Sequence, residues 1–318
     1  MSRRGRSPAL LDGFLVVDKE AGMTSHDVVG ILRRVLGERR IGHAGTLDPD
    51  ATGVLVVVVG RATRLMRFVS GADKAYRGTV VFGATTTTLD AGGEVTASFS
   101  MPGVTLPAVR DAARTMIGRF DQIPPMVSAI KMGGKRLYEL AREGQEVDRV
   151  PRAVEVTRFD VEATDDPLAF QIEVECSAGT YVRSLAADLG AALGGGAYLR
   201  GLHRTRVGSF GLDSAIDAKR ASKEDLRPAV ELLVGLELVS VDEVAVGAIS
   251  HGSVLDRSVV SGRGEGPWAL LDDSGELLAV YESYGEAKIK PIVVHMAVGT
   301  GAEASGAAVE PEGNYDSA

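Results

Sequence analysis

The chain has 318 residues, 45% hydrophobic and 25% charged, which is ordinary for a folded protein of about two domains. Its net charge of -8 argues at first sight against a nucleic-acid partner, because phosphate binding normally leaves a basic footprint. The single cysteine, Cys176, excludes an intramolecular disulfide and fits a reducing compartment, so we expect a cytoplasmic protein. The longest apolar run, residues 54–59, is far shorter than the roughly 20 residues that span a bilayer, so no membrane segment is expected.

The charge is unevenly distributed along the chain. Residues 299–318 contain four acidic residues and no lysine or arginine, so half of the negative excess lies in a segment that we expect to be a disordered acidic tail. Arginines gather at residues 33–67 and 200–206, where they either lie solvated on helix faces or meet phosphates. Residues 1–11 carry three arginines, but Pro8 interrupts the apolar segment of a signal peptide, so a disordered basic leader is expected.

In chain order, the first expected elements are a strand and a helix. Residues 14–18 form a short apolar run that is typical of a strand. Thr24 or Ser25 can cap a helix whose apolar residues recur at helical spacing as far as Leu36, and Gly37 ends it. The next expected elements are a buried strand at 53–60, a short helix at 62–69, an alternating strand at 76–82 and a helix at 107–117 that Gly118 ends.

The second half of the chain predicts more strands. Residues 169–176 alternate apolar and polar side chains, and Thr180 then caps a helix that runs to Leu193. Strands and helices interleave without regular βαβ repetition, which predicts an α+β fold with a mixed, largely antiparallel sheet. A larger domain over residues 12–236 is expected to precede a small β-rich domain over residues 237–298. The strand-like segments of the small domain are 238–241, 254–255, 268–271, 277–280 and 292–295.

Residues 42–53 are the most informative stretch, with the sequence Gly-His-Ala-Gly-Thr-Leu-Asp-Pro-Asp-Ala-Thr-Gly. Its glycines permit close approaches that a side chain would forbid, and an aspartate before a proline favours a turn. Asp48 therefore lies on a tight loop where a ligand can come close, although such an aspartate often only bonds its own turn. The stretch lacks the Gly-Lys-Ser/Thr of a phosphate-binding loop.

A second informative stretch is Gly-Thr-Tyr-Val-Arg at residues 179–183, which places Tyr181 and Arg183 in the first turn of the expected helix. A cation there faces the positive end of the helix dipole, at a cost of a few tenths to about 1 kcal/mol. A carboxylate partner would offset this cost, and Asp48 is the natural candidate. The alternative is a solvated arginine.

These stretches, in this order, resemble the bacterial tRNA pseudouridine synthase B (TruB) family, whose motif reads Gly-His-x-Gly-x-Leu-Asp-Pro-x-Ala-x-Gly. The resemblance covers roughly residues 12–210, and it implies a pseudouridine synthase fold followed by a PUA-like RNA-binding domain. It further implies that Asp48 is the catalytic nucleophile, that Arg183 pairs with it, and that Tyr181 lies against the target base.

Three more residues take roles from the resemblance. Tyr76, in Lys-Ala-Tyr-Arg-Gly, matches a tyrosine whose ring stacks on the flipped uracil, an interaction worth about 1–3 kcal/mol. His43 matches a histidine that moves toward the space vacated by the base. Lys19 lies in a stretch that resembles Lys-Pro-x-Gly-x-Thr-Ser, with Glu20 in place of the proline, and it either contacts substrate or supports the turn.

Residues 122–144 resemble the segment that clamps RNA in this family, which corresponds to about residues 121–150. Lys131, Lys135 and Arg136 are the expected phosphate contacts in it. This segment belongs to the stand-alone bacterial enzymes and is mostly lacking in their guide-dependent relatives. The resemblance therefore implies an enzyme that acts without a guide RNA.

The implied function is isomerisation of uridine to pseudouridine at position 55 of the tRNA T-arm loop, by base flipping, Asp48-dependent glycosidic cleavage and re-joining at C5. No metal or organic cofactor is expected. The expected partner is tRNA, and no association with a membrane is expected. The protein is expected to be a monomer. Two alternatives stay open: an RNA-binding or tRNA-folding protein, and a glycoside hydrolase with Asp50 as the second carboxylate. Retention of Asp48, Tyr76, Tyr181 and Arg183 argues against pure binding.

Overall fold

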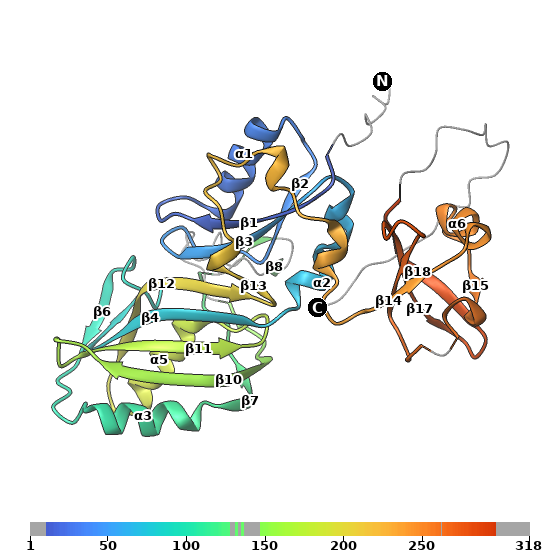
Figure 1. Cartoon of the computed structure of the whole chain (residues 1–318). Coiled ribbons are helices and arrows are strands. Elements are labelled where there is room, and N and C mark those ends of the chain that lie inside the picture. The colour runs from blue at the N-terminus through green and yellow to red at the C-terminus, as the bar shows by residue number, and fades with distance from the viewer. Residues whose placement is uncertain (1–10, 128–130, 133–134, 137–146, 262, 297–318) are drawn as a thin grey trace. The chain divides into compact units, whose positions relative to one another are not determined.

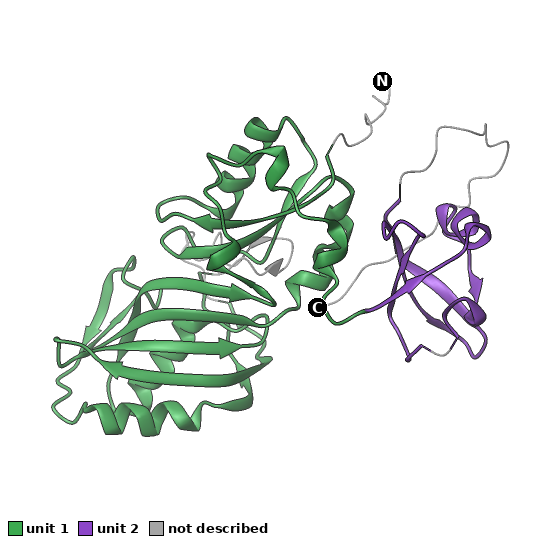
Figure 2. Cartoon of the chain, in the orientation of Figure 1, with its two compact units in different colours: residues 1–236 green, residues 237–318 purple. Residues whose placement is uncertain are grey.

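The computed structural model describes residues 11–127, 131–132, 135–136, 147–261 and 263–296, and it divides the chain into two compact units (Figure 2). The first unit spans residues 1–236 and the second residues 237–318. Apart from Leu11, the expected basic leader and the expected acidic tail lie outside the described residues.

The first unit is built on a nine-stranded sheet with the order β1-β3-β12-β4-β11-β10-β7, in which β2 also pairs with β3 and β13 with β12 (Figure 1). Among the described strands of this sheet, only β3 and β12 run parallel. The α+β fold with a mixed, largely antiparallel sheet is therefore confirmed. The strands are β1 (Gly13–Lys19), β2 (Ile41–Ala44), β3 (Thr52–Val59), β4 (Lys74–Phe82), β7 (Gly118–Gln122), β10 (Arg152–Ala163), β11 (Ala169–Cys176), β12 (Ala197–Val207) and β13 (Phe210–Gly211).

Helix α1 (Ser25–Leu36) begins and ends where the sequence predicts. The Thr24 side chain accepts from the backbone N–H of Asp27, and the Asp27 carboxylate accepts in return from the backbone N–H of Thr24, which forms a capping box. The helix ends at Gly37, whose φ of 68° is the left-handed conformation that glycine adopts at least cost. Its buried face shares a core with β1, β2 and β3, and β2 and β3 are the strands that flank the Asp48 loop.

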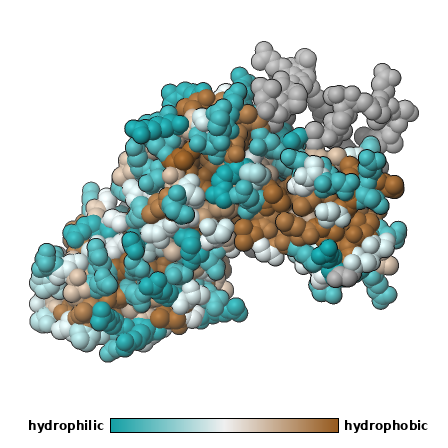
Figure 3. Space-filling model, in the orientation of Figure 1, coloured by the Kyte–Doolittle hydropathy of each residue, from teal (hydrophilic) through white to brown (hydrophobic). Residues whose placement is uncertain are grey.

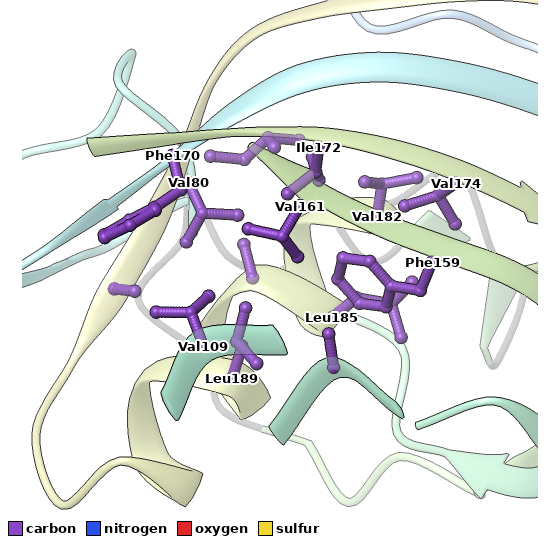
Figure 4. Packing of buried hydrophobic residues seen from close by; sticks show 14 of the residues in the cluster. Val80, Val109, Phe159, Val161, Phe170, Ile172, Val174, Val182, Leu185 and Leu189 are labelled. Carbon is purple, nitrogen blue, oxygen red and sulfur yellow. The ribbon is translucent and has the colours of Figure 1, made fainter. Parts of the chain in front are cut away.

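Helices α3 (Leu106–Thr115) and α5 (Val182–Ala192) cover one face of the sheet (Figure 1). Figure 4 shows Val182, Leu185 and Leu189 of α5 packed against strand residues such as Ile172 and Val174. Two expected helix ends were wrong. Tyr181 and not Thr180 is the N-cap of α5, and α3 stops at Thr115, before Gly118, which begins β7 instead.

The opposite face of β4, β10 and β11 carries paired charges between neighbouring strands. Arg77 on β4 bonds Glu173 on β11 at 2.7 Å, and Arg206 on β12 bonds Glu175 at 2.6 Å. Hydrophilic side chains are spread over this face in Figure 3, and within the described part of the chain no helix lies over it in Figure 1. These charges alternate with buried residues along the strands, so they lie opposite the helix-covered core.

Shorter elements complete the first unit. The expected helix at 62–69 is split into a 3-10 turn, η1 (Gly60–Leu65), and the short helix α2 (Met66–Ser70). Two small hairpins pair β5 (Ala84–Thr86) with β6 (Val95–Ser98) and β8 (Lys131–Met132) with β9 (Lys135–Arg136). Further 3-10 turns are η2 (Leu212–Ser214), η3 (Lys223–Asp225) and η4 (Ala229–Leu232).

The second unit is a five-stranded sheet with the order β14-β16-β17-β18-β15. Its strands are β14 (Glu237–Ser240), β15 (Leu255–Asp256), β16 (Trp268–Leu271), β17 (Leu277–Tyr284) and β18 (Lys288–Val294). Helix α6 (Glu243–Ser250), capped by Asp242, and the turn η5 (Arg257–Val260) were not expected. Trp268 and Tyr281 lie at the centre of its core. The unit is β-rich, and its PUA-like RNA-binding role stays a prediction.

Across the described residues, no helix is long and apolar enough to cross a membrane.

Candidate active site

A pocket of about 320 Å³ lies where the Asp48 loop, β4, β12 and the start of α5 meet. Four side chains that the sequence analysis singled out line it together: Asp48, Tyr76, Tyr181 and Arg183. These residues come from three stretches far apart in the chain, so the fold gathers them in one place. The remaining lining residues are Gly45, Thr46, Leu47, Ser70, Lys74, Gly179, Thr180, Val182, Leu202 and Arg204.

The ion pair expected between Asp48 and Arg183 is present, with Nη2 of Arg183 3.0 Å from Oδ2 of Asp48. Arg183 is only 4% exposed, and its guanidinium also donates to the carbonyls of Thr88 at 2.8 Å and Val127 at 2.9 Å. A second carboxylate, that of Asp90, lies 3.4 Å from its Nη1. Arg183 is therefore held on several sides and keeps a fixed direction toward Asp48.

Asp90 is a site residue that the sequence analysis missed. It lies in the loop of the β5–β6 hairpin, where its Oδ1 accepts from the Thr88 hydroxyl at 2.6 Å and from the backbone N–H of Gly92 at 3.1 Å. A short acid in a Thr- and Gly-rich hairpin is an ordinary turn former, so nothing local distinguished it. Only its contact with Arg183 in the fold identifies Asp90 as a site residue.

The groups around Asp48 shift its pKa in opposite directions. The side chain is 43% exposed, but it lies inside a walled pocket, and this burial raises the pKa of the carboxyl above its ordinary value of 3.8. The Arg183 guanidinium lowers the pKa, and the Asp90 carboxylate raises it. The net direction is upward, so Arg183 limits the shift without abolishing it.

The Asp48 loop is held from both sides by buried polar groups. The Ser25 hydroxyl donates to the carbonyl of Leu47 at 3.2 Å and accepts from its N–H at 2.9 Å. Arg204, 1% exposed, donates to the carbonyls of Gly45 at 3.1 Å and Val54 at 2.7 Å, one at each end of the loop. Gly53 has a φ of +97°, and a Cβ there would lie 2.2 Å from the Arg204 carbonyl oxygen. The glycine is thus required by close packing.

Lys19 supports this loop. Its ammonium donates to the carbonyls of Glu20 at 3.0 Å, Met23 at 2.7 Å and Pro49 at 3.0 Å, which accounts for its three N–H donors. The side chain is 1% exposed and is not among the residues that line the pocket. Burial lowers the pKa of Lys19. This geometry favours a supporting role for Lys19. A contact between Lys19 and substrate stays a prediction.

His43 lies on β2 beside the loop and outside the pocket lining. Its Nδ1 is buried and has no hydrogen-bond partner among the described residues. Burial lowers the pKa of His43, and the nearby Arg204 guanidinium lowers it further, so the neutral imidazole is favoured. The expected movement of His43 toward a flipped base stays a prediction.

Lys74 lines the pocket, and the sequence analysis gave it no role. Its Nζ donates to the carbonyls of Ser70 at 2.7 Å and Ala72 at 2.6 Å. Burial, together with the neighbouring Arg204 charge, lowers the pKa of Lys74 to about 8. Burial likewise raises the pKa of Tyr76, which keeps its phenol neutral. Lys74, Tyr76 and Arg204 line the same pocket as Asp48.

The structure says little about the expected phosphate contacts and about metal binding. Lys131 lies on β8, and Lys135 and Arg136 lie on β9, but their side chains are outside the described structure, so their phosphate contacts stay predictions. Within the described part of the chain, no group of three or more His, Cys, Asp or Glu side chains is arranged to hold a metal ion.

The chain is similar to known proteins over most of its length. Residues 33–182 match the model of the TruB family pseudouridylate synthase N-terminal domain. The tRNA pseudouridine synthases B of Mycobacterium sp. strain KMS and Rhodococcus jostii strain RHA1 are each 44% identical to the chain. The first match covers 89% of this chain and 95% of the relative, and the second covers 90% and 94%. The corresponding protein of Heliobacterium modesticaldum is 43% identical over 86% of this chain and 91% of its own length.

Two solved structures share the fold. A Cbf5-Nop10-Gar1 complex matches with a TM-score of 0.68 at 22% identity, covering 94% of this chain and 92% of that one. The archaeal box H/ACA sRNP Nop10-Cbf5 complex matches with a TM-score of 0.67 at 23% identity, covering 92% and 90%. The similarity over most of the chain shows that it is a pseudouridine synthase. The chain belongs to the TruB family of pseudouridylate synthases.

Proposed function

We propose that this protein is a stand-alone tRNA pseudouridine synthase that isomerises the uridine at position 55 in the T-arm loop. The observation that carries the proposal is the Asp48–Arg183 pair of 3.0 Å in a pocket that also contains Tyr76 and Tyr181. The 44% identity to tRNA pseudouridine synthases B supports tRNA as the substrate. The pocket volume of about 320 Å³ is at the low end for small-ligand sites, which suits a single flipped nucleotide.

The reaction breaks the C1′–N1 glycosidic bond, rotates the uracil and joins its C5 to C1′. The proton on C5 is lost, and N1 gains a proton, so atoms and charge balance without an external reagent. The ionised Asp48 carboxylate can attack C1′, attack C6 or abstract a sugar proton to give a glycal. All three routes require the ionised carboxylate of Asp48 close to the bound nucleotide.

The other pocket residues take roles that follow from their positions. Arg183 keeps Asp48 oriented and opposes the rise of its pKa that burial causes. Tyr76 supplies an aromatic face on which the flipped uracil stacks, which offsets part of the cost of extruding the nucleotide. Tyr181 lies beside C5 of the base and accepts its proton or forms part of the proton's route.

Contacts outside the pocket hold the RNA. Lys131, Lys135 and Arg136 bind phosphates of the T-arm, and the small β-rich unit adds RNA contacts. The enzyme acts as a monomer in the cytoplasm, without a guide RNA, a metal or an organic cofactor. Salt-dependent phosphate contacts of this kind are compatible with an acidic protein, because binding depends on local and not net charge.

The test is to incubate the purified protein with an unmodified tRNA transcript, in the presence of a chelator, and to map pseudouridine by base-specific chemical labelling. Pseudouridine at position 55 alone supports the proposal. Release of free uracil would indicate a hydrolase, and tRNA binding without modification would indicate an RNA-binding or tRNA-folding protein.

A further inference from the structure

The turn that carries Tyr181 is held by a side chain to which neither the sequence nor the proposed function assigns a role. Gln122 is the last residue of β7 and is 3% exposed. The backbone N–H of Tyr181 donates to its Oε1 at 2.8 Å, and its Nε2 donates to the Tyr181 carbonyl at 3.2 Å. The carboxamide thus binds the N–H and the C=O of one residue at the same time.

Helix α5 has no side-chain cap from its own N-cap residue. Tyr181 is the N-cap, and its side chain makes no capping hydrogen bond. Helix N-termini are ordinarily fixed by a Ser, Thr, Asp or Asn side chain at this position. Here the position is occupied by Tyr181, which lines the pocket, and its backbone is bound from outside by Gln122.

The rest of α5 has little freedom to move. Val182, Leu185 and Leu189 are buried against the sheet (Figure 4). The two residues that follow Val182 bind the turn after β7: Arg183 donates to the carbonyl of Val127 at 2.9 Å, and the Ser184 hydroxyl donates to that of Ile123 at 3.5 Å. Tyr181 lies at the end of this fixed helix, and Gln122 binds its backbone there.

Gln122 itself rests on a rigid support. It pairs with Arg152 in the ladder between β7 and β10, so its backbone belongs to the main sheet. Its carboxamide is buried, and an unpaired carboxamide or peptide group would cost free energy there. The amide pair is therefore both strong and directional.

We propose that Gln122 is a positioning residue for pseudouridine formation: its carboxamide fixes the backbone of Tyr181 and so sets where the phenol ring lies over the flipped base. The inference rests on the proposed function, because it concerns the base that enters this pocket. A displacement of about 1 Å in a reacting group can lower a rate by about 100-fold.

Two substitutions test this inference against a matched control. Gln122→Met keeps the length of the side chain and removes both hydrogen bonds. Gln122→Glu keeps the shape and makes the pair depend on pH: the protonated carboxyl accepts from the Tyr181 N–H and donates to its carbonyl, whereas the carboxylate faces that carbonyl with a lone pair. The same changes at Gln171, which is exposed on β11, are the controls.

The measurements are the single-turnover rate of pseudouridine formation in a T-arm stem-loop, the affinity for that RNA and the melting temperature. We expect Gln122→Met to lower the rate by about 10- to 100-fold. Its RNA affinity should stay within about threefold, because phosphate contacts supply most of the binding. The ratio of the Gln122→Glu rate to the wild-type rate should fall as pH rises through the pKa of the introduced carboxyl, which burial places above its ordinary value. The Gln171 variants should match wild type at every pH.

A Gln122→Met rate within about twofold of wild type would overturn the inference, as would a Gln122→Glu ratio that is constant across pH. If Gln122→Met does not fold, the pH dependence of Gln122→Glu decides alone. A wild-type protein that makes no pseudouridine would contradict the proposed function itself, whatever the variants do, so the two failures are distinguishable.

Discussion

Removal of the Arg183 side chain should weaken both the fold and the reaction. Its guanidinium is 4% exposed and meets two carboxylates and two backbone carbonyls. Loss of one partner of a buried ion pair costs about 3–5 kcal/mol. Because Asp48 is 43% exposed and Asp90 28% exposed, water compensates part of the loss, and we expect Arg183→Ala to lower the free energy of unfolding by about 2–3 kcal/mol.

Arg183→Ala should also slow the reaction, because Arg183 orients the Asp48 carboxylate. If the barrier rises by about 2–3 kcal/mol, the single-turnover rate falls by about 30- to 150-fold. Arg183→Lys should recover only part of this, because a single ammonium cannot reach the four partners that a planar guanidinium spans. Arg119→Ala, which removes an arginine that is 84% exposed, is the matched control and should leave the rate unchanged.

The pH dependence of the rate gives an independent test of the role of Arg183. The carboxylate form of Asp48 is the active one, so the rate rises with pH, and the midpoint lies above 3.8 because burial raises the pKa. Arg183 lowers that pKa, so Arg183→Ala should move the acid limb to higher pH. Rapid-quench rates between about pH 4 and 8 measure this. Wild-type rates and an unmoved acid limb in Arg183→Ala would refute the reasoning.

The remaining predictions concern the loop, the termini and the RNA. Lys19→Met removes one hydrogen bond from each of three carbonyls, and it should lower the melting temperature by about 4–10 °C, whereas an unchanged melting curve would show that these bonds contribute nothing. Deletion of residues 299–318 and treatment with a strong chelator should leave turnover intact, and loss on chelation would reveal a required metal. An isolated T-arm stem-loop should be modified nearly as well as whole tRNA, with affinity that falls steeply with salt, and a salt-independent affinity would contradict the phosphate contacts.

The sequence predicted the parts of the site that local chemistry determines. An arginine in the first turn of a helix needs a carboxylate, and the structure contains its pair with Asp48. The capping box at Thr24 and the left-handed Gly37 are equally local, and the ends of α1 were predicted correctly. Asp90 and Gln122 were missed because their importance comes only from contacts with residues 93 and 59 positions away, Arg183 and Tyr181.

The missed strands and helix have physical explanations. Strand β10 carries arginines and acids and strand β12 carries three arginines, and these charges obscure the apolar alternation that marks a strand. Helix α6 did offer a signal, because Asp242 precedes an apolar run and caps it by accepting from the N–H of Ala245 at 2.8 Å. Thr180 was a good capping residue by type, but the turn places Tyr181, which lines the pocket, at the cap.

The role of Asp48 is tested most directly by a T-arm stem-loop that carries tritium at C5 of the target uridine. Wild-type protein should release the label in step with pseudouridine formation. Asp48→Asn keeps the size of the side chain and removes its charge, so it should release no label while binding the RNA within about tenfold of wild type. Label release by Asp48→Asn near the wild-type rate would contradict the assignment of Asp48 as the catalytic carboxylate.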